Sequence, residues 1–368
     1  MAFVRRIKFD RKRIEVVMLL KSCFAVIFAL LAQYAVRLWF FLDYHKSRTI
    51  IHHRPGPCRQ LGGADGGSED LTVLDNGLTF IASGSYPWTR GRILLFNFSN
   101  PFEDAKELPI ISSSLNKSDL VLYGLSTWRD SLTGEITLMV INHAGHHDRV
   151  EVFTFQEDSL TLLHVNSILS PKRNYMNDLV MTSNRTFYIT EYGEMRDNPL
   201  LEMLLMLSYC DILYYNGSEF RSVAHGLRMA NGINVSPDHR YLYVAELGRK
   251  QLKSYRIKDT ELEHVEDLFL DTLLDNIEID PVTGNLWVGC HPLNNALMML
   301  ENYDLGTVAP SQILRVSATD GKFTDAVEVY SDTGSELTAS SVASVYQGKM
   351  IAGSIMSQLI VCDLEYDY

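Results

Sequence analysis

A short apolar strand pattern recurs six times along the sequence, and this repeat limits the possible folds more than any other feature. Each copy is followed by a turn signal and a stronger strand pattern, as in residues 78–83 and 241–247. The spacings between copies are 54, 54, 54, 45 and 65 residues. The copies start at Glu69, Tyr123, Asn177, Asn231, Asn276 and Ser341. Repeats of about 40 to 55 residues with several strands each are typical of propeller blades. The sequence therefore predicts an all-β protein, a six-bladed β-propeller.

Polar side chains recur at one phase of this repeat, which two unrelated β-sandwiches would not explain. In a propeller the first strand of each blade lines the central channel, so equivalent residues of different blades converge there. Carboxylates and amides buried together are unfavourable unless something pairs with them. Calcium binds about six to eight oxygen ligands of this kind. The sequence therefore predicts a central calcium site formed by Glu69, Asn177, Asn231, Asp275 and Asn276.

The N-terminal part of the chain differs in composition from the rest. Residues 1–21 form a basic tail with seven Lys or Arg side chains and two acidic ones. Residues 22–42 are apolar except for Arg37 and, as a helix of about 31 Å, match the hydrocarbon thickness of a bilayer. Residues 43–57 form a polar stalk, and residues 58–368 carry the repeat.

These segments predict a membrane topology. The basic tail is expected on the cytosolic side, so the chain is predicted to be a single-pass type II membrane protein. Its propeller would then lie in the lumen of the endoplasmic reticulum, outside the plasma membrane, or both. A cleaved signal peptide is the alternative, but the apolar segment is long for one and no A-x-A site follows it.

The charge of the chain argues against a nucleic-acid partner. The formal net charge is −12, and the residues after the basic tail are more acidic still. An acidic surface repels a phosphate backbone. Cation binding suits this charge better.

Cysteines and glycosylation sequons also fit a secretory route. Cys23 lies in the apolar segment, which leaves Cys58, Cys210, Cys290 and Cys362 on the oxidising side. A Cys58–Cys362 bond would close the longest loop, but the sequence alone leaves the pairing open. Glycosylation is predicted at Asn97, Asn116, Asn184 and Asn216.

The segment 199–207 is apolar on nearly every side and too short to span a bilayer. It is interpreted either as a buried helix or as an interfacial or docking helix. The sequence leaves both readings open.

With these segments assembled, the chain resembles the paraoxonase/arylesterase family from about Cys58 to Leu364. The matching motifs are Gly67–Leu71, Asn177–Asp178, Ala230–Asn234 with Ser236–Asp238, Asp275–Asn276 running to Asp280–Pro281, Leu286–Pro292 and Ser344–Tyr346. The resemblance implies a six-bladed propeller, in agreement with the repeat.

The resemblance also implies two calcium ions. The upper, catalytic ion would be held by Glu69, Asn177, Asn231, Asp275 and Asn276. The lower, structural ion would be held by Asp70, Asp178 and the backbone carbonyl of Leu125. The family pattern further implies a Cys58–Cys362 disulfide and a free thiol at Cys290.

Family enzymes hydrolyse lactones, aryl esters and organophosphates, with calcium acting on the carbonyl or phosphoryl oxygen and a histidine pair activating water. His143 matches the second histidine of the pair, whereas Tyr123 replaces the first. Tyrosine has a pKa of about 10 and is a poor base at neutral pH. A calcium-bound carboxylate, Glu69 or Asp275, could accept the proton instead.

The layout, with a basic tail before the membrane segment, resembles the membrane-anchored paraoxonase-like proteins of nematodes. This resemblance implies an accessory subunit or endoplasmic-reticulum chaperone for a degenerin/epithelial-type sodium channel, a mechanosensory role. Together with Tyr123, the layout favours a non-enzymatic protein with a channel partner. The alternative is a calcium-dependent arylesterase or lactonase that acts on small esters, lactones or organophosphates.

Overall fold

The computed structural model describes residues 11–46, 50–85, 89–172, 175–194, 198–259, 261–300, 308–356 and 358–365. The chain divides into two compact units, Met1–Ser47 and Arg48–Tyr368. Each is described by itself.

The N-terminal unit contains one long helix, α1 (Arg11–Phe41). Its apolar part runs over Glu15–Phe41, 27 residues, or about 40 Å at the usual rise. Most of its large apolar side chains, such as Phe24 and Phe28, are exposed to solvent. The helix fits a membrane anchor or a signal sequence. The boundaries predicted for the tail, the anchor and the stalk stay predictions, as does the type II topology.

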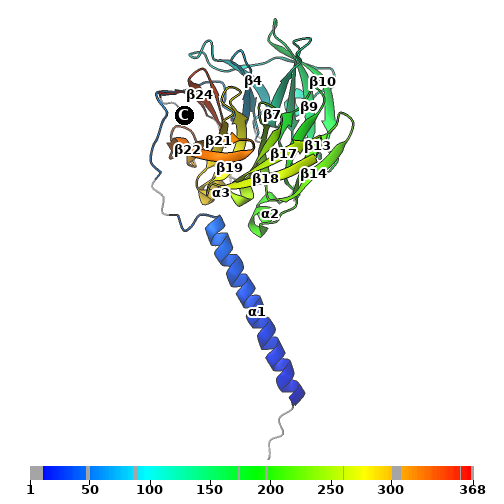
Figure 1. Ribbon diagram of the computed structural model, residues 1–368, viewed down its shortest axis with the longest axis vertical. Coiled ribbons are helices and arrows are strands. Elements are labelled where there is room, and N and C mark those ends of the chain that lie inside the picture. Colours follow the sequence, from blue (N-terminus) through cyan, green and yellow to red (C-terminus); the bar gives the residue numbers. More distant parts are fainter. Residues whose placement is uncertain are drawn as a thin grey trace, which may run out of the picture. The chain divides into compact units, whose positions relative to one another are not determined.

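The second unit contains six sheets, antiparallel except for the pairing of β6 with β10, which confirms the predicted propeller (Figure 1). Blade 1 contains β2 (Asp70–Val73), β3 (Leu78–Ser83), β4 (Arg92–Asn97) and β5 (Lys106–Glu107). Blade 2 contains β7 (Leu122–Arg129), β8 (Ile136–Asn142), β9 (Arg149–Gln156) and β10 (Thr161–Leu169), with β6 (Ile110–Ile111) parallel to β10. Blade 3 contains β11 (Tyr175–Met181), β12 (Phe187–Gly193), β13 (Cys210–Tyr215) and β14 (Phe220–Leu227).

The remaining blades have the same four-stranded order. Blade 4 contains β15 (Ala230–Val235), β16 (Tyr241–Glu246), β17 (Gln251–Lys258) and β18 (Glu261–Phe269). Blade 5 contains β19 (Leu273–Ile279), β20 (Leu286–His291), β21 (Ser311–Thr319) and β22 (Lys322–Asp332). Blade 6 contains β23 (Ser340–Tyr346), β24 (Lys349–Ser354), β25 (Leu359–Asp363) and, from the other end of the propeller, β1 (Cys58–Gln60).

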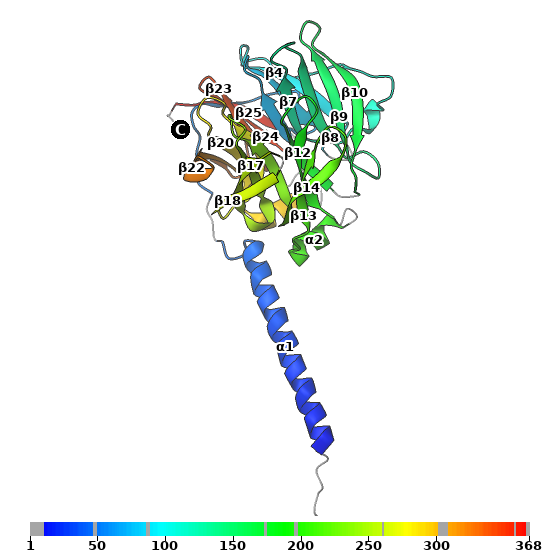
Figure 2. The ribbon, with the colours of Figure 1, turned by 45° about the vertical axis from the view of Figure 1, so that its right-hand side comes forward.

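Blade 6 closes the ring because β1 pairs with β25. Figure 2 shows β25 with β23 and β24 of the same blade. Cys58 lies opposite Cys362 in this pairing, and the two form the disulfide. The predicted bridge is thus confirmed. It joins residues separated by 304 positions, and cross-links of long loops restrict the unfolded chain most. Cys210 and Cys290 are buried free thiols, and Cys23 is an exposed one.

Buried apolar clusters seal each contact between neighbouring blades. Between blades 1 and 2, for example, Phe80 and Phe155 pack edge to face with ring centroids 4.9 Å apart. The two faces of one blade therefore pack against different neighbours, which explains why inner strands such as β8 are buried at every position.

A β-bulge recurs at one place in the innermost strands of blades 2 to 6. The register shifts between Leu122/Leu125, Met176/Leu179, Ala230/Ile233, Leu274/Ile277 and Ser340/Val342. A bulge inserts an extra residue and redirects its side chain. The residues inside these bulges include Tyr123, Asn177, Asn231, Asn276 and Ser341, the starts of the sequence repeat. The repeat phase thus corresponds to a specific backbone irregularity.

Other expectations fall on the connections between strands. The segment 199–207 contains the short helix α2 (Pro199–Leu205), in which Met203 and Glu202 are buried while Leu201 and Leu205 are exposed. It is thus neither wholly buried nor wholly free. The shorter helices are α3 (Asn294–Leu300), η1 (Lys117–Asp119) and η2 (Leu247–Arg249). The sequon residues Asn116, Asn184 and Asn216 are exposed and Asn97 is partly buried; their glycosylation stays a prediction.

Candidate metal centre

The residues predicted to hold the upper calcium ion lie on four different blades. Glu69 directly precedes β2, whereas the others lie inside the bulges of β11, β15 and β19. The innermost strands of neighbouring blades contact each other all the way round the ring. All five side chains are buried: Glu69, Asn177, Asn231, Asp275 and Asn276.

Four side-chain oxygens of this set are buried without a hydrogen-bond partner among the described residues. They are Glu69 Oε2, Asn177 Oδ1, Asn231 Oδ1 and Asn276 Oδ1. Buried polar atoms are nearly always paired in folded proteins, so each exception requires an explanation. Here three of the exceptions lie at the same bulge position of blades 3, 4 and 5, and Glu69 lies at the start of the innermost strand of blade 1. A shared ligand that accepts electron pairs from oxygen is the simplest explanation.

Direct contacts connect blade 1 to blade 5 at this position. Asn276 Nδ2 donates to the backbone oxygen of Glu69 at 2.9 Å and to its Oε1 at 3.3 Å. Burial raises the pKa of Glu69 well above its usual range, and the carboxylates of Asp275 and Asp70 raise it further. Asp275 and Glu69 are therefore close enough to repel each other. A divalent cation between them would remove this repulsion.

Asp275 also contacts a residue that the sequence did not single out. His291 Nε2 lies 2.8 Å from Asp275 Oδ2, and both side chains are buried. His291 is the last residue of β20, opposite Leu273 on β19. His291 lies in the motif Leu286–Pro292, but the sequence assigns no role to its side chain. Nothing in the sequence spacing shows that a bulge brings a carboxylate to it.

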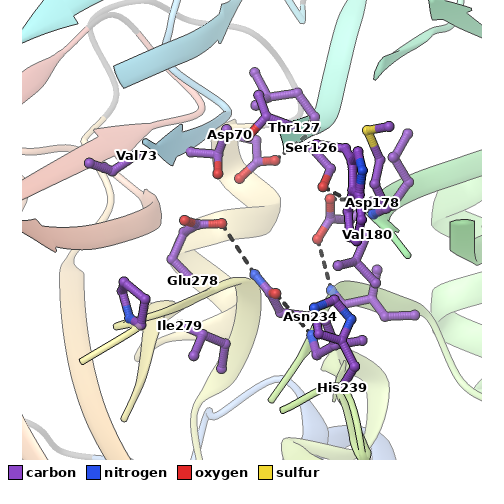
Figure 3. Close-up of a pocket in the computed structure, with 18 residues that line it drawn as sticks. Asp70, Val73, Ser126, Thr127, Asp178, Val180, Asn234, His239, Glu278 and Ile279 are labelled. Carbon is purple, nitrogen blue, oxygen red and sulfur yellow. Dashed lines mark hydrogen bonds between the residues drawn. The ribbon is translucent and has the colours of Figure 1, made fainter. Parts of the chain in front are cut away.

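The residues predicted for the lower ion line a cavity of about 230 Å³ (Figure 3). Asp70, Asp178 and Leu125 contribute to its wall, and the exposed residues His239 and Pro281 place part of it at the surface. None of the five upper residues lines it. Of the adjacent residues Glu69 and Asp70, only Asp70 lines this cavity, and of Asn177 and Asp178 only Asp178 does. The upper and lower sets therefore lie in different places.

Backbone hydrogen bonds fix the two aspartates of the cavity. Asp70 Oδ2 accepts from the Leu125 amide at 2.8 Å, and Asp178 Oδ2 accepts from the Ile233 amide at 2.8 Å. Burial raises the pKa of Asp70 to about 7 despite its backbone donors. Burial, followed by repulsion from Asp70, also raises the pKa of Asp178 well above its usual range.

Glu278 is a third carboxylate in this cavity, and the sequence prediction missed it. Asn234 Nδ2 donates to its Oε1 at 3.2 Å (Figure 3). Burial, together with the charge of Asp70, raises the pKa of Glu278 well above its usual range. A signal was present in the sequence: Glu278 is an acidic residue two positions after Asn276, and side chains two positions apart point to the same face of a strand.

The predicted catalytic pair, Tyr123 and His143, forms an aromatic stack. The ring centroids of Tyr123 and His143 are 4.0 Å apart, and Tyr175 lies 5.3 Å from His143 on a tilted plane. His143 Nε2 lies 2.6 Å from the carbonyl oxygen of Met176 and 3.4 Å from Asp148 Oδ2. Because a carbonyl only accepts, Nε2 carries a hydrogen, and a neutral ring can accept a proton only at Nδ1.

A buried hydrogen-bond network supports the segment that carries His143. Asn142 Oδ1 accepts from the amides of Val121 and Ala144, both at 3.1 Å, while its Nδ2 donates to Glu151 Oε1 at 2.9 Å. His164 Nε2 lies 3.1 Å from the other oxygen of Glu151. The network therefore fixes the backbone on both sides of His143.

The chemistry of the donor set fits calcium. In the part of the chain that the structure describes, no three His, Cys, Asp or Glu side chains are arranged to hold a metal ion by themselves. The upper set contains only two carboxylates, and its other three members are amides. Amide and carboxylate oxygens are hard ligands, which suit calcium rather than zinc.

Comparison with known sequences gives matches that cover most of the chain. The Arylesterase family profile matches residues 52–364. Human serum paraoxonase/arylesterase 1 is 37% identical over 318 residues, covering 83% of this chain and 88% of the relative. Rabbit (Oryctolagus cuniculus) serum paraoxonase/lactonase 3 is 35% identical over 321 residues, covering 84% and 89%.

Solved structures agree on the fold alone. A luciferin-regenerating enzyme superposes with a TM-score of 0.54 at 11% identity, covering 84% of this chain and 96% of that one. A gluconolactonase from Xanthomonas campestris gives a TM-score of 0.50 at 15% identity, covering 86% and 99%. At these identities the similarity concerns the arrangement of the blades.

Proposed function

The chain belongs to the paraoxonase/arylesterase family, and from this membership we propose that it is a calcium-dependent hydrolase of aryl esters or lactones. We further propose two calcium ions, an upper catalytic one and a lower structural one. The membrane anchor would keep the enzyme at a bilayer, where apolar esters concentrate. Residence in the endoplasmic reticulum or at the plasma membrane is part of this proposal.

One observation carries the proposal. Buried oxygens of Glu69, Asn177, Asn231 and Asn276 have no partner in the described structure, and they recur at one phase of the blades. A propeller held together only by apolar clusters would have no need for these amides in its bulges. Leaving them unpaired costs about 1 to 3 kcal/mol for each group. A bound cation accounts for all four.

The residues suggest a division of roles. Bound calcium would polarise the carbonyl oxygen of an ester and stabilise the negative charge that develops on it. Glu69, Asp275 and the three asparagines would hold the ion. His143 Nδ1 is one candidate to accept a proton from water, and Glu69 or Asp275 is the other. Tyr123 can orient water through its hydroxyl but is a poor base at neutral pH.

The direct test uses the full chain in detergent micelles with calcium and a panel of aryl esters and lactones. We expect turnover that chelation abolishes. We expect Asn231→Ala to lower turnover by about 100-fold or more, since it removes an ion ligand, while the circular dichroism spectrum is retained. The matched control is Asn100→Ala, at an exposed turn position. No turnover by a calcium-loaded wild-type protein on any substrate would reject the hydrolase proposal.

A second candidate function is the accessory role for a degenerin/epithelial-type sodium channel. The observation in its favour is that Tyr123 stacks on His143. A tyrosine, which is a weak base, thus occupies the position of the first histidine in the family pattern. Calcium would then only stabilise the fold. Removal of the protein from cells should lower the surface level or current of a co-expressed channel. Unchanged channel maturation across candidate partners would refute it.

A further inference from the structure

We propose that His291 is a positioning residue, which holds the Asp275 carboxylate in the orientation needed to bind the upper calcium ion. The inference rests on the proposed calcium site but not on the proposed hydrolysis. It concerns a contact between a predicted ligand of the ion, Asp275, and a residue that is not itself a ligand, His291. Carboxylates that bind metals are commonly oriented by such hydrogen bonds.

The local backbone brings the two residues together. Cys290 and Leu274 are opposite each other in the register of β19 and β20, and the next regular pair is Val288 with Ile277. Asp275 and Asn276 therefore lie in the bulge between these pairs. The bulge redirects both side chains: Asn276 contacts Glu69, while Asp275 contacts the His291 ring.

The hydrogen bond defines which atoms do what. A carboxylate only accepts, so His291 Nε2 carries the hydrogen and donates it to Asp275 Oδ2 at 2.8 Å. This contact occupies Oδ2 and restricts rotation of the carboxylate, so that Oδ1 is the oxygen not used by this hydrogen bond. His291 Nδ1 is buried and has no partner among the described residues. A lone pair there is less costly than an unpaired N–H, which favours the Nε2–H tautomer.

The neighbouring charges explain why Asp275 needs this support. Without an ion, the charges of the Asp275 and Glu69 carboxylates repel each other. A freely rotating side chain would turn away from Glu69 and from the site. Because both Asp275 and His291 are almost wholly buried, the hydrogen bond is shielded from water and competes well with that rotation.

The test compares two substitutions at one position. His291→Gln keeps an N–H donor near the place of Nε2, whereas His291→Leu keeps the volume and removes the donor. Calcium binding to chelator-treated full chain is measured by isothermal titration calorimetry. We expect His291→Leu to weaken one class of binding sites by about 10- to 100-fold. We expect His291→Gln to restore most of the affinity. His146→Leu, at an exposed position, is the control and should bind as the wild type does.

A double-mutant cycle keeps the test decisive if His291→Leu folds poorly. Its members are His291→Ala, which removes the donor, Asp275→Asn and the double variant. If His291 acts through Asp275, the double variant should bind calcium no more weakly than Asp275→Asn alone. Unchanged affinity in His291→Leu, or fully additive losses in the cycle, would overturn the inference.

The outcome is separable from hydrolysis. A wild-type chain that binds calcium without turnover would refute the hydrolase proposal and leave the role of His291 intact. A wild-type chain that binds no calcium would overturn both.

Discussion

Tyr123 occupies the bulge of blade 2, at the phase where blades 3, 4 and 5 carry asparagines. The Tyr123 ring covers one side of the His143 ring, and the Tyr175 ring also lies near the His143 ring. The stack restricts how His143 can approach a water molecule. A histidine at position 123 would add a base with a pKa near neutrality.

We therefore expect Tyr123→His to raise kcat for ester hydrolysis by about 10-fold or more. The matched control is Tyr123→Phe, which keeps the stack and removes the hydroxyl and should not gain activity. The measurement is the pH dependence of kcat in the three proteins. If Tyr123→His leaves both kcat and its pH profile unchanged in an active enzyme, position 123 does not take part in proton transfer.

Among single residues, the repeat identifies those that recur from blade to blade, whereas contacts between residues without a repeat counterpart give no sequence signal. Asn177, Asn231 and Asn276 could be found because each starts a repeat. His291 and Glu278 could not be placed beside Asp275 and Asn234, because these contacts depend on the bulge and on the packing of different blades. Glu151 was missed since its partners are residues of its own blade, with no repeat counterpart.

The bulges are the elements on which the site depends. Gly232 lies in the bulge of β15, where an added Cβ would approach the backbone oxygen of Asp275 to 2.5 Å and the Cα of Asn276 to 2.6 Å. Only glycine permits this distance between the innermost strands of blades 4 and 5. A side chain there would push apart the residues of the site.

We expect Gly232→Ala to destabilise the protein by about 1 to 3 kcal/mol, as overpacking of a rigid core does, and also to weaken calcium binding. Gly66→Ala is the control, since its added Cβ would come no closer than 3.3 Å to any neighbouring atom. Urea unfolding monitored by circular dichroism measures the stability of both variants, and isothermal titration calorimetry measures their calcium affinity. Equal stability of Gly232→Ala and wild type would show that the strands can separate without cost.

The sequence predicted the inner strands better than the outer ones. Strands such as β16 and β20 are apolar up to their last residues, Glu246 and His291, because both faces are buried. The two-residue strands β5 and β6 are too short to give a pattern. The parallel pairing of β6 with β10 also joins residues far apart in the chain, and no local signal reports it.

For the whole molecule, the ring closes through β1 and the disulfide, while its centre contains several buried acidic residues. Burial raises the pKa of Asp70 from 3.8 to about 7 in the folded protein. An acid whose pKa is higher in the folded than in the unfolded protein binds its proton more tightly in the folded state. Its contribution to stability is therefore fully present below the pKa of the unfolded state. This contribution is lost as the pH rises through the pKa of the folded state. Asp178 and Glu278 are shifted in the same direction.

Calcium-free protein should consequently have a lower Tm at about pH 8 than at about pH 5, and calcium should remove most of this difference by pairing with the ionised carboxylates. Asp70→Asn should reduce the pH dependence of the calcium-free state. Differential scanning calorimetry with and without chelator measures the Tm at both pH values. A calcium-free protein that becomes more stable with rising pH would contradict the assignment of these groups as buried, mutually repelling acids.

The central claim is that oxygens from separate blades enclose calcium at the propeller axis. The most direct measurement is the calcium content of the desalted full chain by mass spectrometry, for the wild type, Asn231→Ala and the control Asn100→Ala. The account predicts two calcium ions per chain in the wild type and the control, and one in Asn231→Ala. A wild-type chain without bound calcium, or an unchanged content in Asn231→Ala, would contradict it.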